Sequence, residues 1–347
     1  MEKEKTNEYN ISKNYDIFDL TRFILSIMII AIHTQLFPKL LYPWLRIAVP
    51  IFFIISSYLL CNKLNYSLPK EKTKIIKKYI KHLLRLYFIW FIILLPVTII
   101  IRQSWFNNGF TQGILNTISN TLFSSTFKGS WYITATIIAT PIVIRFSKGK
   151  NDNLLKFIFI IIYVICCAIS SYSFLFKNCQ TIKQIYNYYI LFFTSPIYSF
   201  PVALIWIYIG KMFADNKSKL VKLKKESYVL IVIISVILLF NEWLIVLLIT
   251  NKCDNDCYLF LVPLSFSIFA LIKNKNIKLK NPKLLRKISS ISYPLHASVA
   301  IIVNILLVVF VNNAELVGLL NFIITSIIVY IVCFIVIKFE KLLKYKE

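Results

Sequence analysis

Acidic residues and histidines are scarce in this chain of 347 residues, and nothing divides it into domains. It holds 15 aspartates and glutamates against 40 lysines and arginines, and only 3 histidines. No histidine accompanies the cysteines, so we expect no metal site. Because no polar linker interrupts the chain, residues 1–347 are predicted to form a single polytopic domain. We find no internal repeat of the kind that marks many transporters.

The N-terminus lacks the features of a cleaved signal peptide. Residues 1–14 are polar and charged, and the apolar run that follows is long enough to span a membrane, so we expect it to be retained. Apolar residues make up 58% of the chain and the mean hydropathy is +0.70, which is too apolar for a soluble domain. The sequence therefore predicts an all-α integral membrane protein, a bundle of about ten transmembrane helices.

The basic residues predict how these helices are oriented. The spans that we predict are residues 16–36, 43–62, 83–101, 130–147, 154–175, 189–210, 228–249, 258–272, 292–311 and 316–337. If the N-terminus is cytoplasmic, the cytoplasmic segments hold 32 of the 40 lysines and arginines, and the outer segments hold 7. Such an excess marks the cytoplasmic side, so both termini are predicted to be cytoplasmic. We therefore attribute the net charge of +25 to the orientation of the helices in the membrane and to contact with the lipid bilayer. We expect no nucleic acid as a partner.

One face of the first span is polar. Tyr15, Asp19, Arg22, Ser26 and His33 recur at helical spacing on this face. Arg22 and His33 are eleven residues apart, which is three turns and about 16 Å along a helix. Charged groups inside a span are costly and usually functional, so we expect the face to point into the bundle. Arg22 is a candidate to bind a phosphate or carboxylate, and the alternative is a structural pair with Asp19.

Histidines are the candidate acid–base groups. A buried neutral imidazole can accept or donate a proton near physiological pH. His33 is predicted to lie toward the outer end of the first span, and His296 near the inner end of the ninth. The alternative for each is a structural histidine. His82 lies beside a lysine-rich loop, which favours a surface role.

Other candidate groups lie at span ends. Lys81 and Arg85, at the inner end of the third span, form a cationic group that either binds a ligand or anchors the helix to the inner surface. Arg46 opens the second span. Trp131 and Tyr132 open the fourth, a depth at which aromatic residues normally form an interface belt.

Two features of the later spans leave alternatives open. Glu242 lies well inside the seventh span and is a candidate partner for a cation or a carrier of protons. Cys253 and Cys257 are predicted to lie in a short outer loop, where they form either a disulfide or two thiols.

The order of these motifs resembles the membrane-bound acyltransferase 3 family. Asp19-Leu-Thr-Arg22, followed by ten residues and His33, is similar to the family's arginine-x10-histidine signature. The later motifs that carry the resemblance are Arg46-Ile-Ala-Val-Pro50-Ile-Phe-Phe-Ile-Ile-Ser56-Ser57-Tyr58, Ser130-Trp131-Tyr132 and Ser292-Tyr293-Pro294-Leu295-His296. The resemblance covers essentially the whole chain. It is close to the membrane domain of vancomycin-resistance serine/alanine racemases, here without the soluble racemase domain.

The chain departs from the family pattern at three positions. Ser57 stands where glycine is usual, and Ala297 follows His296 where proline is common. His82-Leu-Leu-Arg85 replaces a motif of paired arginines that is expected at the donor side.

The resemblance implies O-acyl transfer, usually of an acetyl group, from a cytoplasmic acyl-CoA to a hydroxyl of a cell-envelope glycan or a similar acceptor. His33 would be the catalytic base or acyl relay, and Arg22, with Asp19, would hold the donor or organise the site. The remaining candidates would bind donor or substrate: Lys81, Arg85, Arg46, Trp131, Tyr132, Glu242 and His296. The implied location is a bacterial cell membrane, and a second transfer step would need an envelope-assembly partner protein.

Two other functions stay open at this point. A transporter of an amino acid or saccharide would use Arg22, Asp19 and Glu242 as substrate and proton sites. A non-catalytic membrane partner of an envelope machine would tolerate the loss of His33.

Overall fold

The computed structural model describes residues 2–36, 39–107, 109–147, 152–253 and 255–344, apart from the side chains of 2–15, 39, 152, 191–192, 341 and 343–344. Helices make up 82% of the structure, and no strand occurs in these ranges. The predicted all-α class is confirmed. The chain divides into two compact units: Met1–Phe52 with Ser267–Glu347 (unit 1), and Phe53–Phe266 (unit 2).

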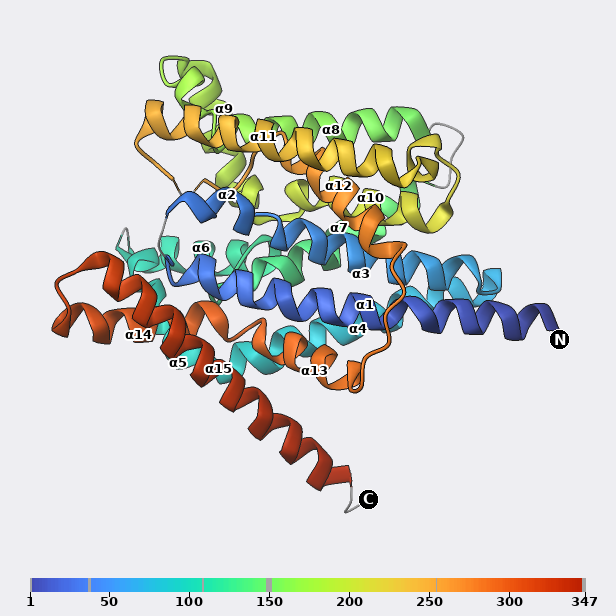
Figure 1. The fold of residues 1–347 in the computed structure, drawn as a ribbon. Coiled ribbons are helices and arrows are strands. Elements are labelled where there is room, and N and C mark those ends of the chain that lie inside the picture. The colour runs from blue at the N-terminus through green and yellow to red at the C-terminus, as the bar shows by residue number, and fades with distance from the viewer. Residues whose placement is uncertain (1, 37–38, 108, 148–151, 254, 345–347) are drawn as a thin grey trace. The chain divides into compact units, whose positions relative to one another are not determined.

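Unit 1 gathers the two ends of the chain. Its long helix α1 packs against α13, α14 and α15, and α14 packs against α15 (Figure 1). The helices of unit 1 are α1 (Glu2–His33), α2 (Tyr42–Leu45), the start of α3 (Ala48–Asn65), the end of α12 (Leu261–Lys273), α13 (Pro282–Ser292), α14 (His296–Phe310) and α15 (Ala314–Lys344).

A bend between α13 and α14 corrects one sequence prediction. The two helices meet at 59°, around Pro294, which lacks the backbone N–H that a continuous helix needs. We predicted that the ninth span starts at residue 292, with His296 near its inner end. In the structure the eleven residues of α13 precede this point, so His296 lies in the middle of a bent helix pair.

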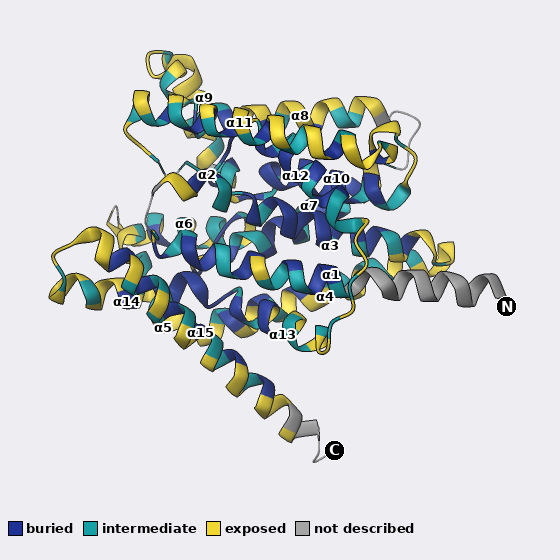
Figure 2. Ribbon diagram, in the orientation of Figure 1, coloured by how far each residue is buried: buried dark blue, intermediate teal, exposed yellow. Residues whose placement is uncertain are grey.

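Unit 2 is built around α10, which is buried along nearly its whole length and packs against α7 and α8 (Figure 2). Its helices are the rest of α3, α4 (Pro69–Ile93), α5 (Leu95–Arg102), α6 (Phe110–Phe123), α7 (Trp131–Phe146), α8 (Asp152–Ile169), α9 (Gln180–Phe193), α10 (Phe200–Asp215), α11 (Lys225–Thr250) and the start of α12. Short 3-10 turns connect several of them.

The predicted span 189–210 is wrong as a single helix. The helix α9 ends at Phe193, and α10 begins at Phe200. Between them Thr194 adopts a positive φ of 63°, and Pro196 lacks a backbone donor. The sequence reads as one apolar run because these breaking residues are few.

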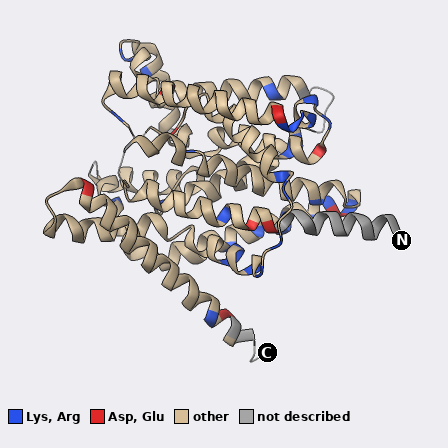
Figure 3. Ribbon diagram, viewed as in Figure 1, with Lys and Arg blue, Asp and Glu red and all other residues tan. Residues whose placement is uncertain are grey.

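Large apolar side chains cover the outer faces of several helices. Leu248 on α11 and Phe310 at the end of α14 are 72% and 83% exposed. Exposed apolar surface of this extent is unfavourable in water and suits contact with lipid. Charged residues lie mostly at helix ends and in loops (Figure 3). These features fit a multi-pass membrane protein.

By length and composition, three helices of the described chain can cross a membrane: Tyr42–Asn65, Lys225–Thr250 and Ala314–Glu340. Two bent pairs, Pro69–Ile93 with Leu95–Phe106 and Pro282–Ser292 with His296–Phe310, raise the number to five. The polar part of α1 explains why that helix does not meet the same criteria, since Asp16, Asp19 and Arg22 interrupt its apolar run. Ten spans and two cytoplasmic termini stay predictions.

Gly210 gives the first test of the packing in unit 2. A Cβ atom at Gly210 would lie 2.5 Å from the carbonyl oxygen of Ile54 and would overlap the Ser57 hydroxyl, both on α3. Because a backbone atom cannot move aside, Gly210→Ala should lower the free energy of unfolding by about 1–3 kcal/mol. Thermal unfolding of the purified protein in detergent measures the change. Ile237→Ala on the exposed side of α11 is the control, and an equal, small effect of both substitutions would contradict the packing.

Candidate functional site

The polar face of α1 lies in unit 1, and other helices of that unit present polar residues to it. We use the term polar stripe for Asp19, Arg22, Ser26 and His33. The side chain of Tyr15, which the sequence placed on the same face, is outside the described part. Because α1 is one continuous helix, Arg22 and His33 are separated by about 16 Å along its axis, as predicted.

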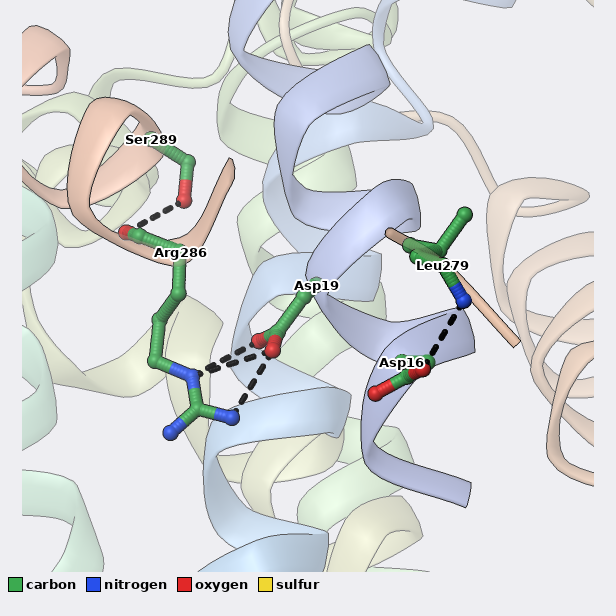
Figure 4. Close-up of polar contacts among 5 residues, drawn as sticks. All are labelled: Asp16, Asp19, Leu279, Arg286 and Ser289. Carbon is green, nitrogen blue, oxygen red and sulfur yellow. Dashed lines mark hydrogen bonds and ion pairs between the residues drawn. The ribbon is translucent and has the colours of Figure 1, made fainter. Parts of the chain in front are cut away.

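At the level of Asp19, the stripe is bound to α13. Arg286 donates from Nε to Asp19 Oδ1 at 2.9 Å and from Nη2 to Asp19 Oδ2 at 2.8 Å (Figure 4). Asp19 is 1% exposed and Arg286 is 48% exposed. One turn earlier, Asp16 Oδ2 accepts a hydrogen bond from the backbone N–H of Leu279 at 3.0 Å. The two-point, charge-assisted pair of Asp19 and Arg286 fixes the orientation of the two side chains as well as the distance between them.

This pair changes the interpretation of Asp19. The sequence offered Arg22 as its partner and gave no sign of Arg286, which is 267 residues away. Both Asp19 oxygens accept from Arg286, so the carboxylate holds α13 against α1. This geometry favours an organising role for Asp19 over direct participation in chemistry.

At the level of Ser26, the stripe faces α15. Ser26 is fully buried, and its hydroxyl donates to the carbonyl of Phe23 at 2.7 Å. The ring of Tyr330 lies 5.8 Å from that of Phe23, with its hydroxyl directed toward Ser26. Among the described residues the buried Tyr330 hydroxyl has no hydrogen-bond partner of ordinary geometry. Sequence reasoning missed Tyr330 because it is one of 20 tyrosines and lies in no motif.

At the end of α1, two histidines meet. The ring centroids of His33 and His296 are 6.4 Å apart with planes 22° from parallel. The ring of Tyr293 meets His296 edge-on at 5.8 Å. His33 is the last residue of α1, and His296, which is 1% exposed, is the first of α14. The structure therefore brings together a predicted catalytic residue and a predicted substrate-binding residue from opposite ends of the chain.

The turn after His33 is held by α15. Gln35 has a positive φ of 53°, and its carbonyl oxygen lies only 2.6 Å from where a Cβ of Gly318 would be. Thr34 donates its hydroxyl to the carbonyl of Ile30 at 2.9 Å. The chain can pass α15 this closely because Gly318 has no side chain. These contacts fix the point at which α1 ends, and so the position of His33.

In unit 2 two of the family-like motifs contact each other. The hydroxyl groups of Tyr132 and Ser56 are hydrogen-bonded at 2.9 Å. The ring of Phe53 lies 4.4 Å from that of Tyr132 and 5.9 Å from that of Trp131. Trp131 and Tyr132 thus pack on α3 and do more than mark an interface.

Glu242 is buried in unit 2 and fully engaged by the chain. It accepts a hydrogen bond from the Tyr172 hydroxyl and from the backbone N–H groups of Leu259 at 2.6 Å and Phe260 at 3.0 Å. These two N–H groups immediately precede α12. A carboxylate at a helix N-terminus stabilises the otherwise unsatisfied donors there. The geometry favours a structural role for Glu242.

The other candidates occupy separate places. Lys81 and Arg85 are exposed one turn apart on α4 of unit 2, and His82 beside them is exposed as well. Arg46 follows α2 in unit 1 and is half-buried. Cys253 and Cys257 are thiols and do not form a disulfide. Within the described ranges, no group of three or more His, Cys, Asp or Glu side chains is arranged to hold a metal ion.

Comparison with known proteins identifies the family. A family model described as an acyltransferase domain, that of acyltransferase 3, matches residues 15–338. The chain belongs to the acyltransferase 3 family. The match confirms the resemblance drawn from the motifs, and with it a transferase domain for acyl groups other than aminoacyl groups.

Two curated relatives of this acyltransferase 3 chain are both named amino-acid racemase and come from Enterococcus faecalis. One is 25% identical over 301 residues, which are 82% of this chain and 41% of the relative. The other is 25% identical over 277 residues, or 75% of this chain and 36% of the relative. The chain thus spans about two fifths of the length of these relatives. No solved structure matches.

The Asp19–Arg286 pair predicts an asymmetric response to substitution. Arg286→Ala leaves the buried carboxylate of Asp19 without this partner and should lower the free energy of unfolding by about 1–3 kcal/mol. This range is smaller than that for a fully buried pair, because solvent screens the half-exposed arginine. Asp19→Asn removes the buried charge itself and should cost less. Thermal unfolding in detergent measures both.

A neighbouring ion pair provides the control. Lys287 and Glu340 are paired at 2.5 Å, but their side chains are 42% and 47% exposed. Lys287→Ala should therefore change stability by less than about 1 kcal/mol. If Arg286→Ala were as mild as Lys287→Ala, the attachment of α13 to α1 through Asp19 would be disproved.

Proposed function

We propose that this protein is a membrane O-acyltransferase that moves an acyl group, with acetyl as the first candidate, from a cytoplasmic acyl-CoA to a hydroxyl of a cell-envelope glycan or similar acceptor. The family match supports acyl transfer in general. The observation that carries the proposal is the pairing of His33 and His296 at the end of the helix that bears Arg22. A base and a polar partner at one end, with a guanidinium about 16 Å away, suit an extended thioester donor.

His33 is proposed to act as the general base. Its neutral imidazole accepts the proton of the acceptor hydroxyl while that oxygen attacks the thioester carbonyl. The new C–O bond forms, and the C–S bond then breaks. The proton passes from His33 to the departing sulfur, so that CoA leaves as a thiol and His33 returns to its neutral form.

Arg22 is proposed to bind a phosphate of the donor. A planar guanidinium matches phosphate oxygens at two points, and it stays charged in a partly buried site. Asp19 and Arg286 hold the neighbouring helix in place, so their contribution is to organise this site. Lys81 and Arg85, exposed on α4 of unit 2, are proposed separately as cationic residues that bind the donor.

The aromatic pair Trp131 and Tyr132 of unit 2 is proposed to bind the acceptor. Arg46 of unit 1 is proposed separately as a substrate-binding residue. A glycan presents both hydroxyl groups and apolar ring faces, which Tyr132 and Trp131 can contact. In this proposal the protein lies in a bacterial cell membrane with ten spans and both termini in the cytoplasm, and any second transfer step needs an envelope-assembly partner protein. The sequence also predicts Glu242 as a substrate-binding residue, but its hydrogen bonds with the backbone N–H groups just before α12 favour a structural role.

Transfer of radiolabelled acetyl from acetyl-CoA to the cell-envelope fraction tests the proposal. Wild type, His33→Ala and Arg22→Ala are compared at equal membrane levels. Loss of a general base typically costs 10²–10⁴-fold in rate, so His33→Ala should abolish detectable labelling. Arg22→Ala should raise the acetyl-CoA concentration needed for half-maximal rate.

Ile237→Ala is the control, because Ile237 lies on the exposed side of α11 and has no proposed role. It should label the envelope like wild type. Labelling that survives in His33→Ala would reject the assigned role of this residue. If wild type transfers no label, yet His33→Ala changes the movement of serine, alanine or glycan across the membrane, the protein is a transporter and the proposal fails.

A further inference from the structure

The helices α14 and α15 of unit 1 contain three buried polar atoms that have no hydrogen-bond partner of ordinary geometry within the described part of the chain. They are Nε2 of His296, the hydroxyl of Tyr330 and the hydroxyl of Ser326. His296 is at the start of α14, and the two hydroxyls are on α15, four residues apart and therefore on one helix face. Buried polar groups in proteins are nearly always bonded, so each of these atoms requires an explanation.

Two contacts fix how α15 runs beside α1. Tyr330 lies against Phe23 and Ser26, and Gly318 lies against the carbonyl of Gln35. The later residue of α15 therefore meets the earlier residue of α1, so the two helices are antiparallel. Ser326 lies between Tyr330 and Gly318 along α15. At about 100° of rotation per residue around the helix axis, its side chain also leaves the helix in a direction between those of Tyr330 and Gly318.

The three unpartnered atoms consequently follow the polar stripe in order. Tyr330 is level with Ser26, Ser326 comes next, and His296 is level with His33. Ser26 is about 6 Å beyond Arg22 and about 10 Å short of His33 along α1, at about 1.5 Å per residue. Hydrogen-bonding groups are thus spaced along the whole length from Arg22 to His33.

An unpaired buried hydroxyl destabilises the fold that contains it. In contrast, Thr325, next to Ser326 on α15, donates to Asn321 at 2.9 Å, and Asn321 donates to the carbonyl of Ala300 at 3.1 Å. The helix therefore satisfies its polar groups where they serve packing alone. Those that face the polar stripe are left for a ligand that carries its own donors and acceptors along an extended chain.

We infer that Tyr330, Ser326 and His296 form the binding track for the amide-bearing arm of the thioester donor, an inference that rests on the proposed function. The pantetheine arm of an acyl-CoA carries two amide groups between its phosphates and its sulfur. With a phosphate at Arg22, the hydroxyls of Tyr330 and Ser326 hydrogen-bond these amides. Nε2 of His296 lies at the thioester end, beside His33, where it bonds the carbonyl oxygen that becomes negative during attack.

Tyr330→Phe and Ser326→Ala test the track, since each removes one oxygen and little else. Without donor, both variants should unfold at the same temperature as wild type or higher, because an unpaired buried group is lost. With donor, each should raise KM for acetyl-CoA by roughly 3–10-fold and change kcat less than about twofold. Thermal unfolding with and without acetyl-CoA, and initial rates of label transfer, provide the two readouts.

Thr325→Ala is the matched control, because it removes a neighbouring hydroxyl that already has a partner. It should lower the unfolding temperature and leave KM for acetyl-CoA unchanged. If Tyr330→Phe and Ser326→Ala behave like Thr325→Ala, their hydroxyls hold only water or the fold, and the inference is overturned.

The result for wild type separates this inference from the proposed function. If the wild-type protein transfers label and both variants have the KM of wild type, the proposed function stands and the binding track is rejected. If the wild-type protein neither transfers label nor is stabilised by acetyl-CoA, acetyl-CoA is not the donor, and the binding track is rejected as well.

Discussion

The cost of burying polar groups among apolar helices determines the arrangement of unit 1. The helix α1 carries an acid, a guanidinium, a hydroxyl and an imidazole along one face, and none of them can face lipid cheaply. Other helices of the unit face these groups: Arg286 from α13 at Asp19, Tyr330 from α15 at Ser26, and His296 from α14 at His33. The packing of the two chain ends follows from this matching.

The hydrogen bonds separate polar groups that hold the fold from those that are available for a ligand. Asp19 and Glu242 have their oxygens engaged by the chain, and Asn321 and Thr325 satisfy each other. Tyr330 and His296, in contrast, keep a buried atom unbonded within the described chain. Under the proposed function, this difference makes the stripe between Arg22 and His33 the proposed binding place of the donor.

The sequence predicted the helical class and the polar face of α1, because helical spacing and charge inside an apolar run are local signals. Its motifs also indicated the family. It did not predict Arg286 or Tyr330, since their pairing with α1 depends on contacts across about three hundred residues that no local pattern encodes. The helices differ from the predicted spans before His296 and before α10, because single prolines, Pro294 and Pro196, interrupt runs whose hydropathy is continuous.

A density map of the protein with a non-hydrolysable thioether analogue of acetyl-CoA tests the central claim, that the polar stripe of α1 holds the donor. The account predicts extended density along α1, with a phosphate at Arg22, the arm passing the hydroxyl of Tyr330, and the acyl end between His33 and His296. Density for the analogue elsewhere, with the stripe filled by protein side chains or water alone, would contradict it.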